Sequence, residues 1–133
     1  MARSWLATCL VFAWAFPWTY LGIALGVVGL LTGGGGQRMG RVLEFHGGLL
    51  NWLLLKAPIA GGAAALTLGH TVLARTSADL DGARSHELIH VAQYERWGPL
   101  FVPAYLLCSA WLWLRGRDPY FDNPFEQEAY GAE

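Results

Sequence analysis

Long apolar runs separated by short polar segments define the elements that this chain is predicted to form. Residues 5–31 contain no charged side chain, and a helix of that length exceeds the roughly 30 Å hydrocarbon core of a bilayer. Residues 100–114 form a second apolar run, which at about fifteen residues is too short for a full span. We therefore expect one transmembrane helix near the N-terminus, and a shorter apolar helix that packs in the core or lies in the membrane interface.

The N-terminal run has a second interpretation, because Arg3 places a positive charge before an apolar region, as in a secretory signal peptide. The run is longer than a usual signal core and no Ala-x-Ala cleavage site follows it, so we predict an uncleaved anchor. The glycines at 33–36 end the run and predict a flexible hinge. The expected division is an anchor with its hinge at residues 1–36 and a folded domain at residues 37–133.

The segment between the two apolar runs carries weaker patterns. Residues 42–45 and 65–73 favour short strands, the second because it contains β-branched residues and partly alternates. Residues 49–56 fit either a strand or a helical turn. The alternative is a second transmembrane helix from about 48 to 74, interrupted by Lys56 and Pro58. We expect the strands, and hence an α+β fold with a small sheet.

The most informative polar segment is 85–94, where two histidines lie four residues apart on a predicted helix. Residues i and i+4 share a helix face, so the imidazoles of His86 and His90 can converge on one metal ion. Neutral imidazole suits zinc, and a catalytic zinc keeps three protein ligands and a water whose pKa falls to about 7. Glu87 lies about 100° around the helix from His86, where its carboxylate can take a proton from that water. This spacing is the HExxH arrangement of zinc peptidases.

A third ligand is expected from a later element, and residues 123–130 provide the best candidate. Asn123 and Pro124 have the pattern of a helix N-cap and first helical position, with Glu126 as the third residue of that helix. The Glu126 carboxylate can bind the metal, or it can complete a capping box with the amide of Asn123. Glu128 is the second candidate for the third ligand.

The pairing of His86-Glu87-x-x-His90 with Glu126-x-x-Ala129 resembles the gluzincin metallopeptidases, especially membrane-associated members whose third ligand opens a Glu-x-x-Ala-Asp helix. The resemblance covers residues 79–131 and rests on these motifs. It implies that Glu126 is the third zinc ligand. It also implies a minimal zincin-like domain, in which an edge strand at 66–73 aligns an extended peptide beside the motif helix.

Two positions qualify this resemblance. Tyr130 stands where the gluzincins usually carry Asp, although a phenol can still donate a hydrogen bond. The run from 86 to 93 is also similar to bacterial metallopeptidase domains with a His-Glu-Leu-x-His-Val-x-Gln pattern. Gln93, three residues after His90, can orient a ligand or bind substrate, but an exposed helical Gln is commoner and is what we expect here.

Other polar residues receive simpler assignments. His46 and His70 are isolated, so we expect structural histidines. Ser77, Asp79 or Asp81 is expected to cap the motif helix. The triplet at 80–82 is similar to the Leu-Asp-Gly ligand motif of intramembrane metalloproteases, but there it follows the HExxH helix and here it precedes it.

Composition favours a membrane protein. Hydrophobic residues make up 54% of the chain and charged residues only 14%, against about 25% charged in soluble proteins. The net charge is −1 and there is no basic run, so nucleic acid is not an expected partner. Cys9 and Cys108 show no disulfide or metal-ligand spacing.

Together these patterns predict a membrane-anchored zinc metallopeptidase that hydrolyses a peptide or protein substrate. His86, His90 and Glu126 are the expected ligands of Zn²⁺, and Glu87 is the expected base that activates water. Two alternatives stay open. One is a metal-binding membrane or assembly protein without catalytic activity, and the other is a purely structural membrane protein.

Overall fold

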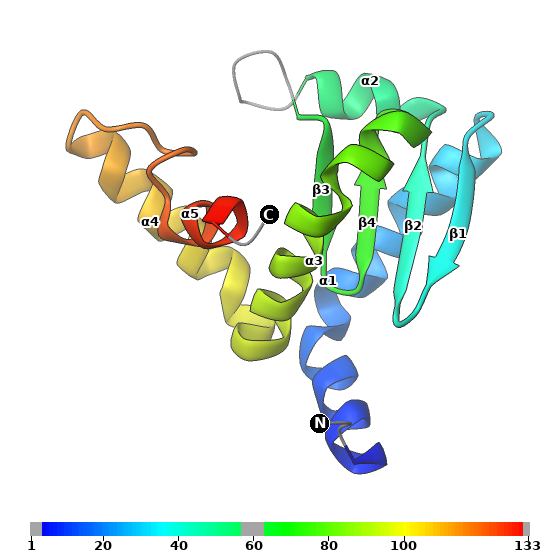
Figure 1. Ribbon diagram of the computed structural model, residues 1–133, viewed down its shortest axis with the longest axis horizontal. Helices are drawn as coiled ribbons and strands as arrows, with labels where there is room; N and C mark the ends of the chain where they lie inside the picture. Colours follow the sequence, from blue (N-terminus) through cyan, green and yellow to red (C-terminus); the bar gives the residue numbers. More distant parts are fainter. Residues whose placement is uncertain (1–3, 57–62, 132–133) are drawn as a thin grey trace.

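The computed structural model describes residues 4–56 and 63–131, which form a four-stranded sheet with helices on both faces (Figure 1). Arg3, on which the signal-peptide interpretation depends, and Pro58 lie outside the described residues. The fold is α+β, as predicted. In chain order, the elements are α1 (Trp5–Leu31), β1 (Gly35–Met39), β2 (Val42–His46), α2 (Leu49–Leu55), β3 (Ala65–Leu68), β4 (Thr71–Ala74), α3 (Ser77–Trp97), η1 (Gly98–Leu100), α4 (Phe101–Leu114) and α5 (Pro124–Gly131).

The sheet has the strand order β1-β2-β4-β3. The β1–β2 and β3–β4 pairs are antiparallel, whereas the two central strands, β2 and β4, are parallel. The strand predicted at 42–45 is confirmed as β2, but the single strand predicted at 65–73 is a hairpin. Gly69, at φ 60°, turns the chain there, in a conformation that a residue without a Cβ adopts at little cost. The hairpin leaves β3 at one edge of the sheet.

The helical interpretation of residues 49–56 is the correct one, because α2 covers Leu49–Leu55. A transmembrane helix from 48 to 74 is therefore wrong. The helix ends at Lys56, whose N–H bonds the carbonyls of the last turn, and the β3–β4 hairpin occupies the end of that range. The pairing of β4 with both β2 and β3 satisfies its backbone groups within the sheet.

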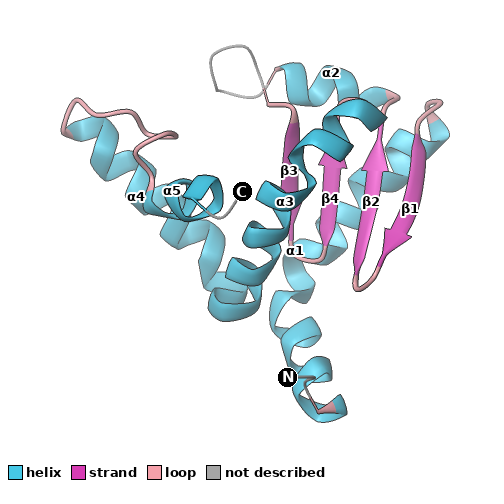
Figure 2. Cartoon of the chain, viewed as in Figure 1, coloured by secondary structure: helices cyan, strands magenta, loops and turns pink. Residues whose placement is uncertain are grey.

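Two hydrophobic clusters hold helices against opposite faces of the sheet (Figure 2). On one face, Leu80 and Val91 of α3 share a buried cluster with Val72. On the other, Trp18 of α1 packs on a cluster that contains Leu73. Each such fully buried aliphatic side chain contributes about 1.5–3 kcal/mol. The sheet is thus the middle of three layers, with α1 and α2 behind it and α3 in front.

Glycines allow α1 to approach the sheet closely. A Cβ added at Gly22 would collide with Thr71, and one added at Gly26 would collide with the ring of Phe45. Neither position therefore accepts a side chain without a shift of the helix. The C-terminal half of α1 is therefore packed into the folded core.

The glycine segment after α1 is also structured. Gly33, at φ 101°, turns the chain, and Gly35 and Gly36 then pair with His46 and Phe45 at the start of β1. The expected hinge at 33–36 is accordingly a turn followed by a strand. Residue 36, the expected boundary of the anchor, lies inside that strand.

The outward face of α1 is apolar and exposed. Its large exposed side chains include Trp5, Leu6, Leu10, Phe16, Tyr20, Leu21, Val27, Val28, Leu30 and Leu31. Figure 1 shows the N-terminal half of α1 projecting beyond the sheet. This half contacts little of the folded core and keeps the apolar character that led to the prediction of an anchor.

Among the described residues, one continuous helical stretch has the length and apolar composition needed to cross a membrane. It runs from Ser77 to Leu114, through α3, η1 and α4, and is not N-terminal. Its charged residues all lie in α3, whereas α4 contains none. Because a core helix of a soluble protein can meet the same criterion, this stretch alone does not establish a span.

Candidate metal centre

The motif helix α3 is held at both ends by local signals. Its N-cap is Thr76, whose hydroxyl accepts a hydrogen bond from the Asp79 N–H at 3.0 Å. The cap therefore precedes all three residues predicted as caps from the sequence, Ser77, Asp79 and Asp81. Asp79 contributes its backbone amide to the cap and places a carboxylate near the positive end of the helix. At the other end, Gly98 at φ 59° terminates the helix. His86, Glu87 and His90 are all buried on this helix.

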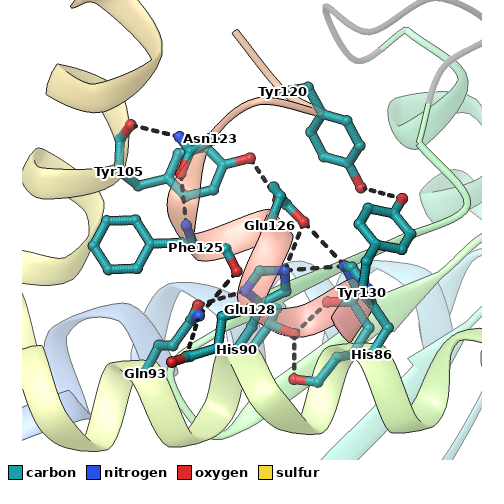
Figure 3. Close-up of polar contacts among 12 residues, drawn as sticks. His86, His90, Gln93, Tyr105, Tyr120, Asn123, Phe125, Glu126, Glu128 and Tyr130 are labelled. Carbon is teal, nitrogen blue, oxygen red and sulfur yellow. Dashed lines mark hydrogen bonds and ion pairs between the residues drawn. The ribbon is translucent and has the colours of Figure 1, made fainter. Parts of the chain in front are cut away.

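The helix α5 carries Glu126 into the site. Asn123 caps it, because its side-chain oxygen accepts from the Phe125 N–H at 3.0 Å. The Asn123 amide group donates in turn to the carbonyl oxygen of Tyr105, so the start of α5 is fastened to α4. The predicted cap is therefore correct, but the capping box is wrong, since the Glu126 carboxylate points to the histidines of α3 (Figure 3).

The three predicted ligands converge on one point. The Nε2 atoms of His86 and His90 each lie 3.0 Å from Oε1 of Glu126, and 3.2 Å from each other. Tetrahedral zinc, with bonds of about 2.0–2.1 Å, holds its ligand atoms about 3.3 Å apart. A buried cluster of this size can hold a metal ion with only slight expansion.

The ionisation of Glu126 suits a metal ligand. Burial alone would raise the pKa of this carboxyl, but hydrogen bonds with His86 and His90 lower it to about 2. The Tyr105 hydroxyl donates to the second carboxylate oxygen at 2.6 Å. One oxygen is thereby held by α4, while the other faces the two imidazoles.

Glu128 is not positioned as a ligand. Its carboxylate accepts from Gln93 and from Arg96, and its side chain is about half exposed. Glu126 and Glu128 are two residues apart on a helix, so they point in different directions. The structure therefore favours Glu126 over the second candidate.

Gln93 is fully buried, which contradicts the expectation of an exposed helical Gln. Its side-chain oxygen lies 2.7 Å from Nδ1 of His90, and its amide nitrogen donates to the Phe125 carbonyl oxygen and to Glu128 (Figure 3). This contact orients the His90 ring so that Nε2 faces the other ligands. A buried amide also joins α3 to α5 at the level of the candidate ligands.

Glu87 is held by a residue that the sequence did not single out. The Thr67 hydroxyl, on β3, donates to Oε2 of Glu87 at 2.6 Å. Burial raises the pKa of the Glu87 carboxyl above its ordinary value. Both residues line the same cavity as the three candidate ligands.

This cavity has a volume of about 840 Å³ and lies between β3 on one side and α4 on the other. Its lining is mostly apolar and contains no Lys or Arg among the described residues. The apolar side chains that line the cavity include Trp18, Leu54, Leu66, Phe101, Val102 and Leu106. Apart from the candidate ligands and Glu87, the cavity therefore presents a largely apolar surface.

Two tyrosines close one side of the cavity. The Tyr130 ring packs on His86 with centroids 4.3 Å apart, and its hydroxyl lies 3.0 Å from that of Tyr120. Tyr130 stands at the position where gluzincins usually carry Asp. Unlike Asp, it has no carboxylate with which to bond a ligand. It contacts His86 through its ring.

The remaining histidines are not part of the cluster. His70 is buried, with its Nε2 2.9 Å from Oε2 of Glu95. His46 lies on β2 and pairs with Gly35 across the sheet. The described residues contain one group of potential metal ligands, and it includes neither of them.

No family model matches this chain, and no curated protein or solved structure is significantly similar to it. The assignment of a function therefore depends on the geometry of the site.

Proposed function

We propose that this protein is a zinc-dependent metallopeptidase anchored in a membrane. The observation that carries the proposal is the convergence of His86, His90 and Glu126 at 3.0–3.2 Å beside the buried carboxylate of Glu87. Structural zinc sites usually have four protein ligands, whereas catalytic sites have three and keep one position open. The cluster contains three such residues in the described part of the chain, and it faces a cavity.

In this proposal, each side chain has a defined task in hydrolysis. When bound, zinc polarises the substrate carbonyl and lowers the pKa of water. Glu87 accepts a proton from the water while the water oxygen bonds to the carbonyl carbon of the substrate. Glu87 then passes that proton to the leaving nitrogen as the C–N bond breaks. Tyr120, which lines the cavity, can donate a hydrogen bond to the oxygen on which charge develops.

The edge strand supports a peptide as the substrate. Among the described strands β3 pairs only with β4, so its other edge can bond an extended chain. Residues 65–68 of this strand also line the cavity. A peptide added to β3 would therefore pass beside Glu87 and the metal ligands.

Membrane attachment is assigned to α1. Its N-terminal half projects from the fold and exposes Trp5, Leu6 and Leu10, and residues 5–31 carry no charge. Lipid would cover this surface at a gain of about 25 cal/mol per Å². Substrates are then peptides that reach the membrane surface.

Metal content is the first test. Elemental mass spectrometry would be applied to detergent-purified wild type, His86→Ala and Glu126→Ala, with His46→Ala as the control from outside the cluster. We expect about one zinc per chain in wild type and control, and loss of zinc in both ligand variants. Wild type that stays metal-free after zinc is resupplied would refute the proposal.

Activity is the second test. Zinc-loaded wild type would be incubated with a library of quenched fluorescent peptides in detergent or vesicles, with and without a chelator. We expect cleavage that the chelator stops and that added zinc restores. Stoichiometric zinc without cleavage of any peptide would instead favour a metal-binding protein without catalysis.

A further inference from the structure

The edge strand β3 contributes a side chain to the site as well as a free edge. Thr67 is buried, and its hydroxyl donates to Oε2 of Glu87 at 2.6 Å. The same hydroxyl lies 3.3 Å from the main-chain oxygen of Glu87. The contact joins two elements that the sequence separates by twenty residues.

We propose that Thr67 is a positioning residue that fixes the carboxylate of Glu87 for proton transfer. The inference rests on the proposed peptidase function. Thr67 holds Oε2 of Glu87, and within the described residues no side chain donates a hydrogen bond to Oε1, which can accept a proton.

Geometry explains why such a contact matters. The side chain of Glu has three rotatable bonds, and its terminal torsion is broad, so a carboxylate is poorly oriented by rotamer preference alone. A charge-assisted O–H···O bond of 2.6 Å is short and strong. Misplacing a reacting group by about 1 Å can lower a rate by about 100-fold.

The strand itself is fixed at the same residue. The Tyr94 hydroxyl, on α3, donates to the carbonyl oxygen of Thr67 at 3.1 Å. Thr67 thus ties the edge strand to α3 through three contacts, two from its hydroxyl to Glu87 and one from the Tyr94 hydroxyl to its carbonyl oxygen. A peptide paired with β3 would meet Glu87 at a register that Thr67 sets.

A second buried threonine provides a matched control. Thr71 lies on β4, and its hydroxyl donates to the Leu68 carbonyl oxygen within the hairpin. Thr71 does not line the cavity. Its replacement removes a buried hydroxyl from the same sheet without touching Glu87.

The kinetic test compares Thr67→Val, Thr67→Ser and the control Thr71→Val. We expect Thr67→Val to lower kcat by about 10–100-fold, with KM and zinc content unchanged. Thr67→Ser should restore most of the rate because it keeps the hydroxyl, and Thr71→Val should leave kcat close to wild type. Adding Thr67→Val to Glu87→Gln should cause no further loss, because the threonine acts through the carboxylate. Equal kcat in wild type and Thr67→Val would overturn the inference.

A binding test makes the inference independent of turnover. Acetohydroxamate, which ligates zinc and can hydrogen-bond the neighbouring carboxylate, would be titrated calorimetrically into each zinc-loaded variant. We expect about tenfold weaker binding to Thr67→Val and Glu87→Gln, no additional loss in the double variant, and unchanged binding to Thr71→Val. Weaker binding to Glu87→Gln alone, or to neither variant, would overturn the role of Thr67. The expected pattern in a protein that cleaves no peptide would support Thr67 and refute the peptidase proposal.

Discussion

Two groups of buried carboxylates lie along α3, and they differ in the side chains that face them. In the first group, the guanidinium of Arg84 bonds both carboxylate oxygens of Glu44 at 2.9 Å, and Arg41 bonds Glu95. In the second group, Glu126 faces only imidazoles and a phenol. The first group carries permanent cations, whereas the second has none of its own.

This difference distinguishes a structural ion-pair group from a group that could hold a metal ion. A buried carboxylate paired with Arg is neutralised in place, and the Glu44 carboxylate in turn raises the pKa of Arg84. In the second group, burial lowers the pKa of each imidazole, but the neighbouring Glu126 and Glu87 raise it above its ordinary value, and burial raises the pKa of the Glu87 carboxyl. A divalent cation at the cluster would balance both carboxylates.

The largest expected effect comes from the base in the second group. Glu87→Gln keeps the size of the side chain but removes its capacity to accept a proton, so peptide hydrolysis should fall by about 10²–10⁴-fold. Zinc content should stay at the wild-type value, since the ligands are untouched. Steady-state cleavage and elemental analysis of the same preparation measure both quantities. Hydrolysis that survives in pure Glu87→Gln would remove Glu87 from the mechanism.

In the first group, we expect a substitution to lower stability and to leave zinc binding unchanged. Arg84→Met leaves the fully buried carboxylate of Glu44 without its guanidinium, which should lower the free energy of unfolding by about 3 kcal/mol. Zinc affinity of the folded protein should not change, because Arg84 contacts none of the ligands. Denaturant unfolding of the zinc-loaded protein and a competitive zinc titration provide the two measurements. A large loss of zinc affinity with normal stability would erase the distinction between the groups.

A smaller effect is expected at Gln93, which borders the second group. Gln93→Ala removes the oxygen that lies 2.7 Å from Nδ1 of His90, so the ring loses the contact that orients it. Zinc affinity should fall by about 10–100-fold, measured by competition with a chelator of known affinity. Gln93→Glu, which keeps an acceptor oxygen, should be less affected. Unchanged affinity in Gln93→Ala would show that packing alone orients His90.

The smallest effect is expected at Glu128. Glu128→Gln disturbs an exposed pair with Arg96, and such pairs contribute only about 0–1 kcal/mol. Zinc content and stability should stay close to wild type in the two assays used for Arg84→Met. Loss of zinc in this variant would make Glu128, and not Glu126, the third ligand.

The sequence was sufficient to find the three residues of the candidate metal cluster, because helix geometry relates spacing to direction. His86 and His90 share a helix face because they are four residues apart. The Asn123-Pro124 cap identified the helix that carries Glu126. The residues that support them were harder to find. The position of Gln93, three residues after His90, indicated that it can orient a ligand, but its burial depends on contacts with α5 that the sequence does not show. Thr67 meets Glu87 through a long-range contact, and its sequence context does not differ from that of an ordinary strand Thr.

The packing of α1 was missed for a different reason. An uncharged run shows that a helix is apolar, but lipid and a sheet face both accept such a helix. The informative residues are Gly22, Gly26 and Gly29, at which an added Cβ would meet side chains of the sheet or of α2. Their regular spacing indicates close contact with protein. Likewise, Gly69 was the one residue that could have divided 65–73 into two strands.

The distance along the chain between His86 and Glu126 also matters while the protein is being made. The two residues are forty positions apart, and α5 is the last helix of the described chain. Domains form progressively as a ribosome releases them at about 5–20 residues per second, so the sheet and α3 emerge before Glu126 does. A nascent chain at that point would hold two histidines and a base without the third ligand. The candidate metal cluster would then assemble after the sheet and α3 have folded, when α5 packs against them.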